Sequence, residues 1–356
     1  MVKTILVTGG AGFVGSNLAI KLKNQFRAEA RIICLDNLKR RGSELNIDRF
    51  RENGIEFLHG DIRNMEDLEA VGKVDLILEC SAEPSVLAGY DGSPRYLLQT
   101  NLAGTINCLE IARTHQADFI FLSTSRVYPI KLIFQLEYIE NESRFDLAPD
   151  QNQIGVSPRG FNEDFPLDGT RSLYGATKLC SEHIIQEYSE MYNIRAVINR
   201  CAVLTGPWQM GKVDQGVVSL WVARHIFKGE LGYFGYGGQG KQVRDILDVD
   251  DLFRLLLIQL EDLDCHNGAV YNVGGGREIS ISLNELTDMC EQVTGNRIKI
   301  KSVPETRVAD IPYYITDNTK VTAATGWQPE KKPLDIVKEI AAWILDNKVY
   351  LKNLLN

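Results

Sequence analysis

A glycine-rich turn between a short apolar run and a helical pattern constrains the fold of this chain most strongly. The turn, Thr8-Gly-Gly-Ala-Gly-Phe-Val-Gly15, directly follows the β-branched run at residues 4–7. In the pattern Gly-x-Gly-x-x-Gly, the first glycine permits a tight turn, the second lets backbone amides approach a pyrophosphate, and the third lets helix and strand pack closely. The following helix dipole favours an anion. We predict a dinucleotide-binding strand, turn and helix; a turn used only for packing is the alternative.

Short apolar runs alternate with helical patterns through the first 200 residues. The runs occupy residues 4–7, 31–35, 55–58, 76–78, 119–122 and 196–199. Nearly continuous apolar strands separated by helices are typical of a parallel sheet covered on both faces. We therefore predict an α/β fold with a Rossmann-type, doubly wound parallel sheet.

The length of 356 residues exceeds the size at which one hydrophobic core stops growing. We predict a cofactor-binding domain over residues 1–205 and a smaller mixed α/β substrate domain mainly over 206–356, from which segments can return to the first. Residues 129–172 break the strand and helix pattern with charged and turn residues. Such a long excursion, here near the expected active site, is usually functional or disordered. A last amphipathic helix is predicted over about residues 334–345.

Composition and charge exclude several classes of function. The chain has 39 basic and 47 acidic side chains, a net charge of -8, and no dense basic block, so we expect no nucleic-acid partner. No apolar run approaches the ~20 residues that a membrane helix needs. Seven scattered cysteines without a Cys-x-x-Cys pair suit a reducing cytoplasm. The five histidines have no ligand spacing, so we expect no metal site.

Acidic residues at two strand ends suggest which dinucleotide is bound. Asp36 ends the second run, 21 residues after Gly15, where a carboxylate can accept hydrogen bonds from an adenosine ribose. Its charge repels a 2′-phosphate, which favours NAD over NADP, although the basic residues 39–41 could accommodate a phosphate in another geometry. Asp61 and Ile62 follow the third run and can meet adenine, but an acidic residue there is also a common turn former.

Tyr174 and Lys178 are candidates for proton transfer because a four-residue spacing places both on one face of a helix. A phenol of pKa ~10 is a poor base at neutral pH, but a neighbouring cation and the positive nicotinamide of NAD favour its phenolate. Alone, this spacing is more typical of a surface pair. Thr124 offers a hydroxyl at the end of the fifth run, the edge where doubly wound sheets bind ligands. A Ser/Thr turn that caps the strand is the alternative.

Several motifs occur together in one order along the chain. They are the glycine turn, Asp36-Asn37-Leu38, Gly60-Asp61-Ile62, Asn101-Leu-Ala-Gly-Thr105, Ser123-Thr124 through Val127-Tyr128, and Tyr174-x-x-x-Lys178. With them the chain resembles, over essentially its whole length, the extended short-chain dehydrogenase/reductases, which are nucleotide-sugar epimerases, dehydratases and decarboxylases with tightly held NAD. The resemblance implies Thr124, Tyr174 and Lys178 as catalytic residues, with Tyr174 exchanging a proton with a sugar hydroxyl while the attached carbon gives hydride to nicotinamide.

The cofactor site implied by this resemblance combines the glycine turn with the ends of the following strands. Its residues are Gly9, Gly10, Gly12, Phe13, Val14, Gly15, Asp36, Asn37, Asp61, Ile62, Ser81, Ala82, Asn101, Tyr174 and Lys178. Glu83 also lies in a segment expected to face the cofactor cleft, and a turn residue before Pro84 is an equal alternative.

The residues after Thr124 distinguish the reactions of this family. Its dehydratases have Asp-Glu there because elimination of water needs an acid and a base, whereas Ser125-Arg126 stands here. The basic residue resembles the CDP-paratose 2-epimerase branch, as do the excursion and the segments 214–216 and 240–245. The implied substrate residues are Ser125, Arg126, Asp214, Gln215, Gly216, Arg244 and Arg307. The last two have the fork geometry that suits a diphosphate, and surface ion pairs are their alternative role.

The sequence therefore predicts an NAD-dependent epimerase that inverts carbon 2 of a nucleotide-linked hexose, with a CDP sugar favoured, through a 2-keto intermediate. The same chemistry at carbon 4, as in UDP-glucose 4-epimerase, is the alternative. A non-catalytic NAD-binding regulatory protein is an alternative of another class, but it would not need Thr124, Tyr174 and Lys178 together. The resemblance further implies a homodimer or homotetramer that pairs the helices near Tyr174 and before Phe119.

Overall fold

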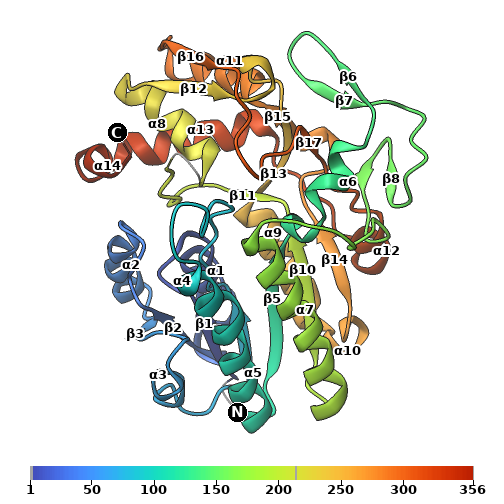
Figure 1. The fold of residues 1–356 in the computed structure, drawn as a ribbon. Helices are drawn as coiled ribbons and strands as arrows, with labels where there is room; N and C mark the ends of the chain where they lie inside the picture. The colour runs from blue at the N-terminus through green and yellow to red at the C-terminus, as the bar shows by residue number, and fades with distance from the viewer. Residues whose placement is uncertain (1–2, 213–214, 356) are drawn as a thin grey trace. The chain divides into compact units, whose positions relative to one another are not determined.

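Seven parallel strands form the central sheet of the computed structural model, which describes residues 3–212 and 215–355 (Figure 1). Their order is β3-β2-β1-β4-β5-β10-β14. The strands are β1 (Lys3–Thr8), β2 (Ala30–Asp36), β3 (Glu56–His59), β4 (Leu76–Glu79), β5 (Asp118–Thr124), β10 (Ala196–Cys201) and β14 (Val270–Val273). The predicted Rossmann-type sheet is confirmed, and its first six strands correspond to the six apolar runs.

The chain divides into two units. The first comprises residues 1–127, 172–200 and 253–271, and the second comprises 128–171, 201–252 and 272–356. Most of the excursion thus belongs to the second unit, whereas residues 253–271 return to the first. The predicted division of function, with cofactor binding in 1–205 and substrate binding mainly in 206–356, stays a prediction.

The order of the strands reverses between β1 and β4. From β1 the chain proceeds outward through β2 and β3, and then returns to add β4 on the other side of β1. β1 pairs with β2 through Thr8 and Leu35, and with β4 through Thr8 and Glu79. In open parallel sheets, ligands bind at the carboxyl ends of the strands beside such a reversal.

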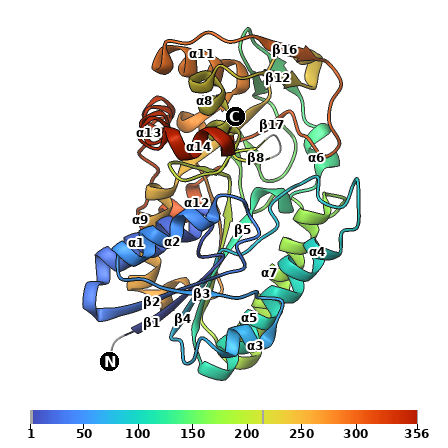
Figure 2. The same ribbon diagram turned by 90° about the vertical axis from the view of Figure 1, so that its left-hand side faces the viewer.

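Helices cover both faces of this sheet, and Figure 2 shows α1 on one face and α5 and α7 on the other. Helices with residues in the first unit are α1 (Phe13–Phe26), α2 (Asn46–Glu52), α3 (Met65–Glu69), α4 (Arg95–Leu98), α5 (Gly104–His115), α7 (Leu173–Tyr192), α9 (Val249–Glu261) and α10 (Leu263–His266). Between α4 and α5 lies the π-helical turn η3 (Gln99–Ala103). The core on the α5 side includes Leu6, Ile77, Leu109 and Phe119, all fully buried.

The second unit is a mixed α/β structure. Its helices are α6 (Ile130–Phe134), α8 (Val217–Phe227), α11 (Leu283–Thr294), α12 (Thr319–Thr325), α13 (Pro333–Asp346) and α14 (Lys348–Leu355). Its remaining strands are β6 (Tyr138–Glu140), β7 (Phe145–Leu147), β8 (Val156–Ser157), β9 (Gly160–Phe161), β11 (Val203–Thr205), β12 (Leu231–Phe234), β13 (Val243–Asp248), β15 (Ser280–Ser282), β16 (Ile300–Val303) and β17 (Tyr313–Tyr314). Helix α13 confirms the last amphipathic helix, and α14 follows it.

The excursion is structured within the second unit. Strands β6 and β7 pair as one antiparallel hairpin, and β8 and β9 pair as another. At the first hairpin, Ser143 donates a hydrogen bond to Glu285 at 3.0 Å and Arg144 donates one to Ser280 at 2.7 Å. At the second, Phe161 pairs with Thr316. The first hairpin is therefore held by polar side chains of the same unit, and the second by a backbone bridge.

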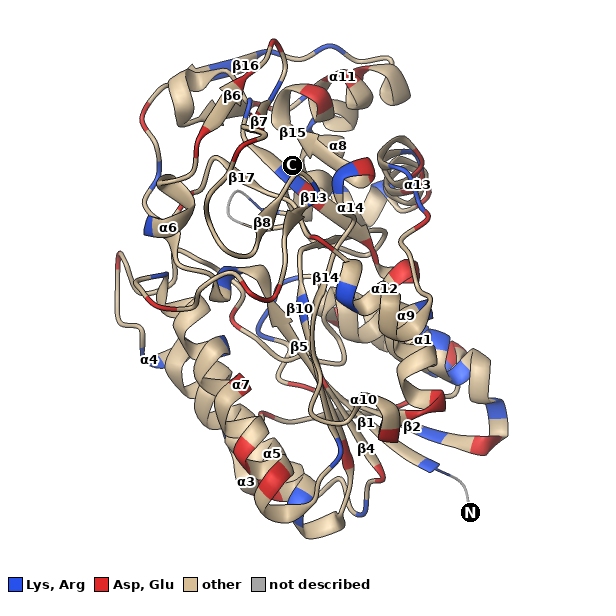
Figure 3. Ribbon diagram, turned by 90° about the vertical axis from the view of Figure 1, so that its right-hand side faces the viewer, with Lys and Arg blue, Asp and Glu red and all other residues tan. Residues whose placement is uncertain are grey.

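Basic and acidic residues are interspersed along the chain in the view of Figure 3. Within residues 3–212 and 215–355, no helix is long and apolar enough to cross a membrane. The same part of the chain holds no group of three or more His, Cys, Asp or Glu side chains that could bind a metal ion.

Candidate active site

The glycine turn packs backbone against backbone at the reversal of the strand order. Gly9 has a φ of +61°, and a Cβ there would lie 2.8 Å from the backbone nitrogen of Ser81. A Cβ at Gly10 would lie 2.5 Å from the Cβ of Cys34, and one at Gly15 would lie 2.9 Å from the Cα of Gly10. Glycine is therefore required at these three positions by contacts within the protein.

Gly12 differs from the other glycines of the turn. A Cβ at this position would approach only the Gly9 carbonyl oxygen, at 3.1 Å. Gly12 is also the N-cap residue of α1, and Phe13 and Val14 begin that helix. The first N–H groups of a helix lack intrahelical acceptors and attract anions. The unfilled side of Gly12 thus fits a pyrophosphate that approaches the helix N-terminus.

Asp36 joins the end of β2 to the glycine turn. One carboxylate oxygen accepts a hydrogen bond from the Ala11 N–H at 3.1 Å, and the other accepts one from the Leu38 N–H at 2.7 Å. Burial raises the pKa of Asp36, and these backbone hydrogen bonds act against that rise. Leu38 has a φ of +53°, an uncommon conformation for a branched side chain. The carboxylate lies where the sequence predicts an adenosine ribose.

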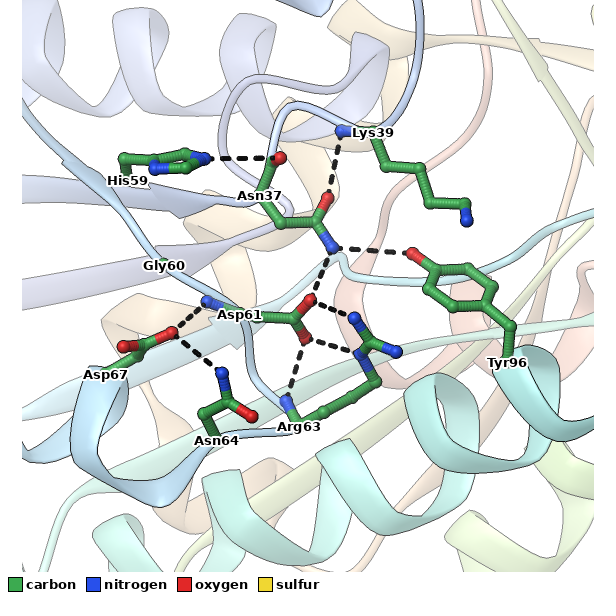
Figure 4. Close-up of a pocket in the computed structure, with 9 residues that line it drawn as sticks. All are labelled: Asn37, Lys39, His59, Gly60, Asp61, Arg63, Asn64, Asp67 and Tyr96. Atoms are coloured by element: carbon green, nitrogen blue, oxygen red, sulfur yellow. Dashed lines mark hydrogen bonds and ion pairs between the residues drawn. The ribbon is translucent and has the colours of Figure 1, made fainter.

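A polar pocket follows β2 and β3 (Figure 4). Asp61 accepts hydrogen bonds from the Arg63 guanidinium at 2.6 and 2.9 Å and from the Asn37 amide at 2.7 Å. Burial opposes ionisation of Asp61, but the hydrogen bonds from Arg63 and Asn37 outweigh it and lower the pKa of this carboxyl group to about 2. The pocket therefore keeps a fixed negative charge at the place predicted to meet adenine.

Tyr96 forms an aromatic wall of this pocket, which the sequence reasoning missed. The Lys39 ammonium lies 3.7 Å from the centre of its ring and the Arg63 guanidinium lies 4.7 Å from it (Figure 4). Such contacts are cation–π interactions. The first residue of the basic run at 39–41 is therefore engaged by an aromatic ring. A tyrosine 60 residues away from Asp36 gives no local signal of this contact.

The segment after β4 is supported by Asn101, which lies in the π-helical turn η3. The side-chain oxygen of Asn101 accepts a hydrogen bond from the Glu83 N–H at 2.7 Å, and its amide donates to Thr177 of α7 at 3.3 Å. The Glu83 carboxylate accepts from the Ser85 N–H, as a turn residue does. Asn101 thus links Glu83, which follows Ser81 and Ala82, to α7. π-Helical turns are frequent at functional sites.

Thr124 ends β5 and is 7% exposed. Its hydroxyl oxygen accepts a hydrogen bond from the Arg126 N–H at 3.2 Å. A hydroxyl that accepts one bond still has a proton to donate. Thr124 can therefore present a hydrogen-bond donor at the carboxyl edge of the sheet, and Ser125 and Arg126 follow it in a short 3-10 turn.

Helix α7 carries Tyr174 and Lys178 in its first two turns. Its N-cap is Ser172, whose hydroxyl accepts a hydrogen bond from the Gly175 N–H at 3.2 Å. Lys178 is only 2% exposed, and its ammonium lies 3.8 Å from the centre of the Phe121 ring on β5. Lys178 is therefore buried against β5, the strand that ends in Thr124. The alternative that Tyr174 and Lys178 form a surface pair does not fit this burial.

Glu79 is a second buried titratable group beside Lys178, and the sequence reasoning missed it. It ends β4, is fully buried, and pairs in register with Phe121. Thr105 donates a hydrogen bond to one carboxylate oxygen at 3.2 Å. Burial raises the pKa of Glu79, whereas the Lys178 charge and the Thr105 hydrogen bond act in the opposite direction. A buried carboxyl group therefore lies near the Lys178 ammonium in the interior beneath the site.

The other predicted substrate residues belong to the second unit, and Asp214 lies outside the described residues. Gly216 has a φ of +68° and is the N-cap residue of α8, and Gln215 forms a backbone bridge with Lys212. Arg244 donates hydrogen bonds to Asp310 at 2.9 Å and to the Ile311 carbonyl at 2.6 Å.

Arg307 lies close in sequence to these partners of Arg244. Its guanidinium lies 3.7 Å from the centre of the Phe234 ring. The carbonyl oxygen of Arg307 accepts a hydrogen bond from the Asp310 N–H at 3.2 Å. The segment 307–311 therefore contains Arg307 and accepts hydrogen bonds from Arg244.

Comparisons with known proteins show the family of the chain. The family model described as "NAD dependent epimerase/dehydratase family" matches residues 5–274. CDP-paratose 2-epimerase from Salmonella typhi is 30% identical over 95% of this chain and 98% of its own. UDP-glucose 4-epimerase from Thermotoga maritima, solved with UDP-glucose, is 25% identical with a TM-score of 0.77, covering 97% and 99% of the chains. dTDP-glucose 4,6-dehydratase from Bacillus anthracis, solved with NAD, is 25% identical with a TM-score of 0.76 and 99% coverage of both.

A doubly wound sheet with a glycine turn and a strand-end carboxylate is typical of dinucleotide-binding proteins. The chain belongs to the NAD-dependent epimerase/dehydratase family, and its cofactor is NAD. The predicted resemblance to the extended short-chain dehydrogenase/reductases is thereby confirmed.

The glycines of the turn allow a paired test. We expect Gly12→Ala to fold normally but to bind NAD at least ~10-fold more weakly, because its methyl group would enter the side left for pyrophosphate. Gly15→Ala should instead unfold at a lower temperature, since overpacking costs about 1–3 kcal/mol. Calorimetric titration with NAD and thermal unfolding measure the two effects. Gly12→Ala with wild-type NAD affinity would contradict this assignment.

Proposed function

We propose that the protein is a nucleotide-sugar epimerase that inverts carbon 2 of a CDP-linked hexose, using NAD. Its similarity to the Salmonella typhi CDP-paratose 2-epimerase supports this choice, because that relative matches nearly the whole chain. Arg126 after the catalytic threonine also supports it, since the acidic pair of the dehydratases is missing. CDP-paratose is therefore the first substrate to test.

The observation that carries the proposal is the placement of Lys178. The buried ammonium of this residue packs on β5, one turn along α7 from Tyr174, and β5 ends in Thr124. A lysine side chain is rarely buried without a function or a partner. In the proposed reaction, its charge stabilises the phenolate form of Tyr174, which then accepts the proton of the sugar hydroxyl.

Thr124 and Tyr174 are both proposed to bind the sugar oxygen that loses its proton. The Arg126 N–H fixes the Thr124 oxygen, so the Thr124 proton can point toward the substrate and orient the oxygen that loses its proton to Tyr174. When bound, NAD supplies the acceptor that takes hydride from the sugar carbon and returns it to the opposite face. Tyr174 then returns the proton, so the reaction has no net redox change.

The substrate residues predicted from the sequence are part of the proposal. Ser125 and Arg126 follow Thr124 directly, and Gln215 and Gly216 begin α8. We assign Arg244 and Arg307 to the diphosphate because guanidinium groups bind phosphate oxygens through charge-assisted hydrogen bonds. Both arginines have planar groups that already contact partners in the second unit, which limits the rotamer freedom lost on binding.

Inversion at carbon 4 is the second candidate. It is favoured by the likeness to the UDP-glucose 4-epimerase of Thermotoga maritima, which covers 97% of this chain. Thr124, Tyr174 and Lys178 would act in the same way at carbon 4. The two functions therefore differ in which sugar carbon the substrate residues bring to the catalytic residues.

We also propose a homodimer or homotetramer in the cytoplasm. Helix α7 exposes Leu173, Met191 and Tyr192, which gives its outer side apolar area for a second copy. The cysteines of the described residues form no disulfide, which suits a reducing compartment.

Loss of the Tyr174 phenol should abolish most of the turnover. We expect Tyr174→Phe to lower kcat at least ~100-fold with nucleotide binding retained, as removal of a general acid–base group does. Tyr188→Phe is the matched control, since it also removes a phenol from α7. The Tyr188 hydroxyl donates a hydrogen bond to Glu110 at 2.6 Å. That variant should keep kcat within about twofold. Turnover of Tyr174→Phe near that of the control would exclude Tyr174 as the base.

The site of inversion can be read from the product. The purified protein is incubated with CDP-paratose and, separately, with UDP-glucose, and the products are analysed by NMR. We expect inversion at carbon 2 of the CDP sugar and little change of the UDP sugar. Inversion at carbon 4 of UDP-glucose alone would move the assignment to the 4-epimerases and leave the catalytic residues in place.

A further inference from the structure

Three polar side chains from three elements meet in the interior behind the candidate catalytic residues. They are Ser123 of β5, Glu182 of α7 and Arg200 of β10. The Ser123 hydroxyl donates a hydrogen bond to the Glu182 carboxylate at 2.5 Å. Arg200 donates to both oxygens of the same carboxylate, through Nη2 to Oε2 at 2.7 Å and through Nε to Oε1 at 3.2 Å. Glu182 is 2% exposed and Arg200 is 5% exposed, so the ion pair is buried.

This ion pair lies on the functional face of α7. Tyr174, Lys178 and Glu182 follow one another at four-residue spacing, which places all three along one side of the helix. Ser123 immediately precedes Thr124 at the end of β5. The contacts of Glu182 therefore tie the catalytic side of α7 to the strand end that carries the catalytic threonine.

Burial of this ion pair is hard to explain by stability alone. Desolvation of two charges often cancels their attraction, and apolar side chains of equal volume hold a core together as well. A bidentate arginine–carboxylate contact has, however, a directional geometry that packing of apolar side chains lacks. Its angular preference can fix how far a helix lies along a strand and how it is rotated.

We propose that Glu182 is a positioning residue, which Arg200 and Ser123 hold so that Tyr174 and Lys178 stand in the correct register with Thr124. Glu182 acts through the helix and contacts neither substrate nor NAD in this role. The inference rests on the proposed catalytic function of these three residues. A displacement of about 1 Å can cost roughly 100-fold in rate, so a small shift of α7 is sufficient.

The chain offers a matched control at the other end of the same strands. Arg195, which precedes β10, donates hydrogen bonds to Asp118 at the start of β5 at 2.7 and 2.9 Å. This contact is also a bidentate arginine–carboxylate pair, and it links β5 to the residue before β10 without involving α7. It lies at their amino ends, whereas Thr124 lies at the carboxyl end of β5.

The main test compares Glu182→Gln with Asp118→Asn in the full-length protein, with CDP-paratose as the probe. We expect Glu182→Gln to lower kcat about 10- to 100-fold while KM and the content of bound NAD change less than about twofold. Asp118→Asn should lower the unfolding temperature but keep kcat within about twofold. A wild-type kcat for Glu182→Gln, or an equal loss of kcat in both variants, would overturn the proposal.

Two further variants separate positioning from stability. Ser123→Ala removes one hydrogen bond to Glu182 and disturbs folding less than Glu182→Gln does. This variant should lower kcat about 3- to 10-fold at an almost unchanged unfolding temperature. The double variant Glu182→Gln/Arg200→Met removes both buried charges, so the unfolding temperature should recover while kcat stays low. Recovery of kcat together with stability, or a wild-type kcat for Ser123→Ala, would contradict a positioning role.

Crystal structures make the test independent of turnover. In Glu182→Gln, the first two turns of α7 should shift against the end of β5 by on the order of 1 Å; an unchanged overlay would refute the proposal even if no sugar is converted. Tyr174→Phe, measured in the same assay, reports on the proposed function itself. If Tyr174→Phe retains full turnover, the proposed function fails. If Tyr174→Phe is inactive and Glu182→Gln is fully active, only the positioning role of Glu182 is refuted.

Discussion

The closeness of three backbone segments at the glycine turn is the constraint on which the site depends. Gly9 lies against Ser81 after β4, Gly10 lies against Cys34 of β2, and Gly15 lies against the turn itself. No side chain larger than hydrogen fits these contacts. Because they hold, the N-terminus of α1 and the carboxyl ends of β1, β2 and β4 share one edge. A dinucleotide can span these groups only when they lie together.

A second constraint is the concentration of charge in the layer between the sheet and α7. Lys178, Glu79, Glu182 and Arg200 are each 5% exposed or less, although isolated charges are strongly disfavoured in a protein interior. They are neutralised in part by neighbours of opposite sign. Electrostatic effects are stronger in such a dry layer than at the surface. These buried groups therefore lie beside the residues that are proposed to move a proton.

Much of the first unit could be predicted from the sequence, because parallel strands are apolar runs and the glycine turn follows one of them directly. Local spacing also placed Tyr174 and Lys178 on one helix. The contact between Asn37 and Asp61 and the contacts around Tyr96 were missed, since they depend on how distant segments meet. Glu182 is different: its spacing of four residues from Lys178 was visible, but its partner Arg200 is 18 residues further on. The hairpins of the excursion were hidden because their strands have only two or three residues.

The central claim of the proposal is that a redox step inverts carbon 2 of the sugar, with Tyr174, Lys178 and Thr124 as the catalytic residues. A CDP-hexose deuterated at carbon 2 tests it most directly. The account predicts slower turnover when chemistry limits the rate, and an inverted product that keeps its deuterium, since a closed site excludes exchange with water. Loss of the carbon-2 deuterium to solvent would indicate proton abstraction without hydride transfer and would contradict the mechanism.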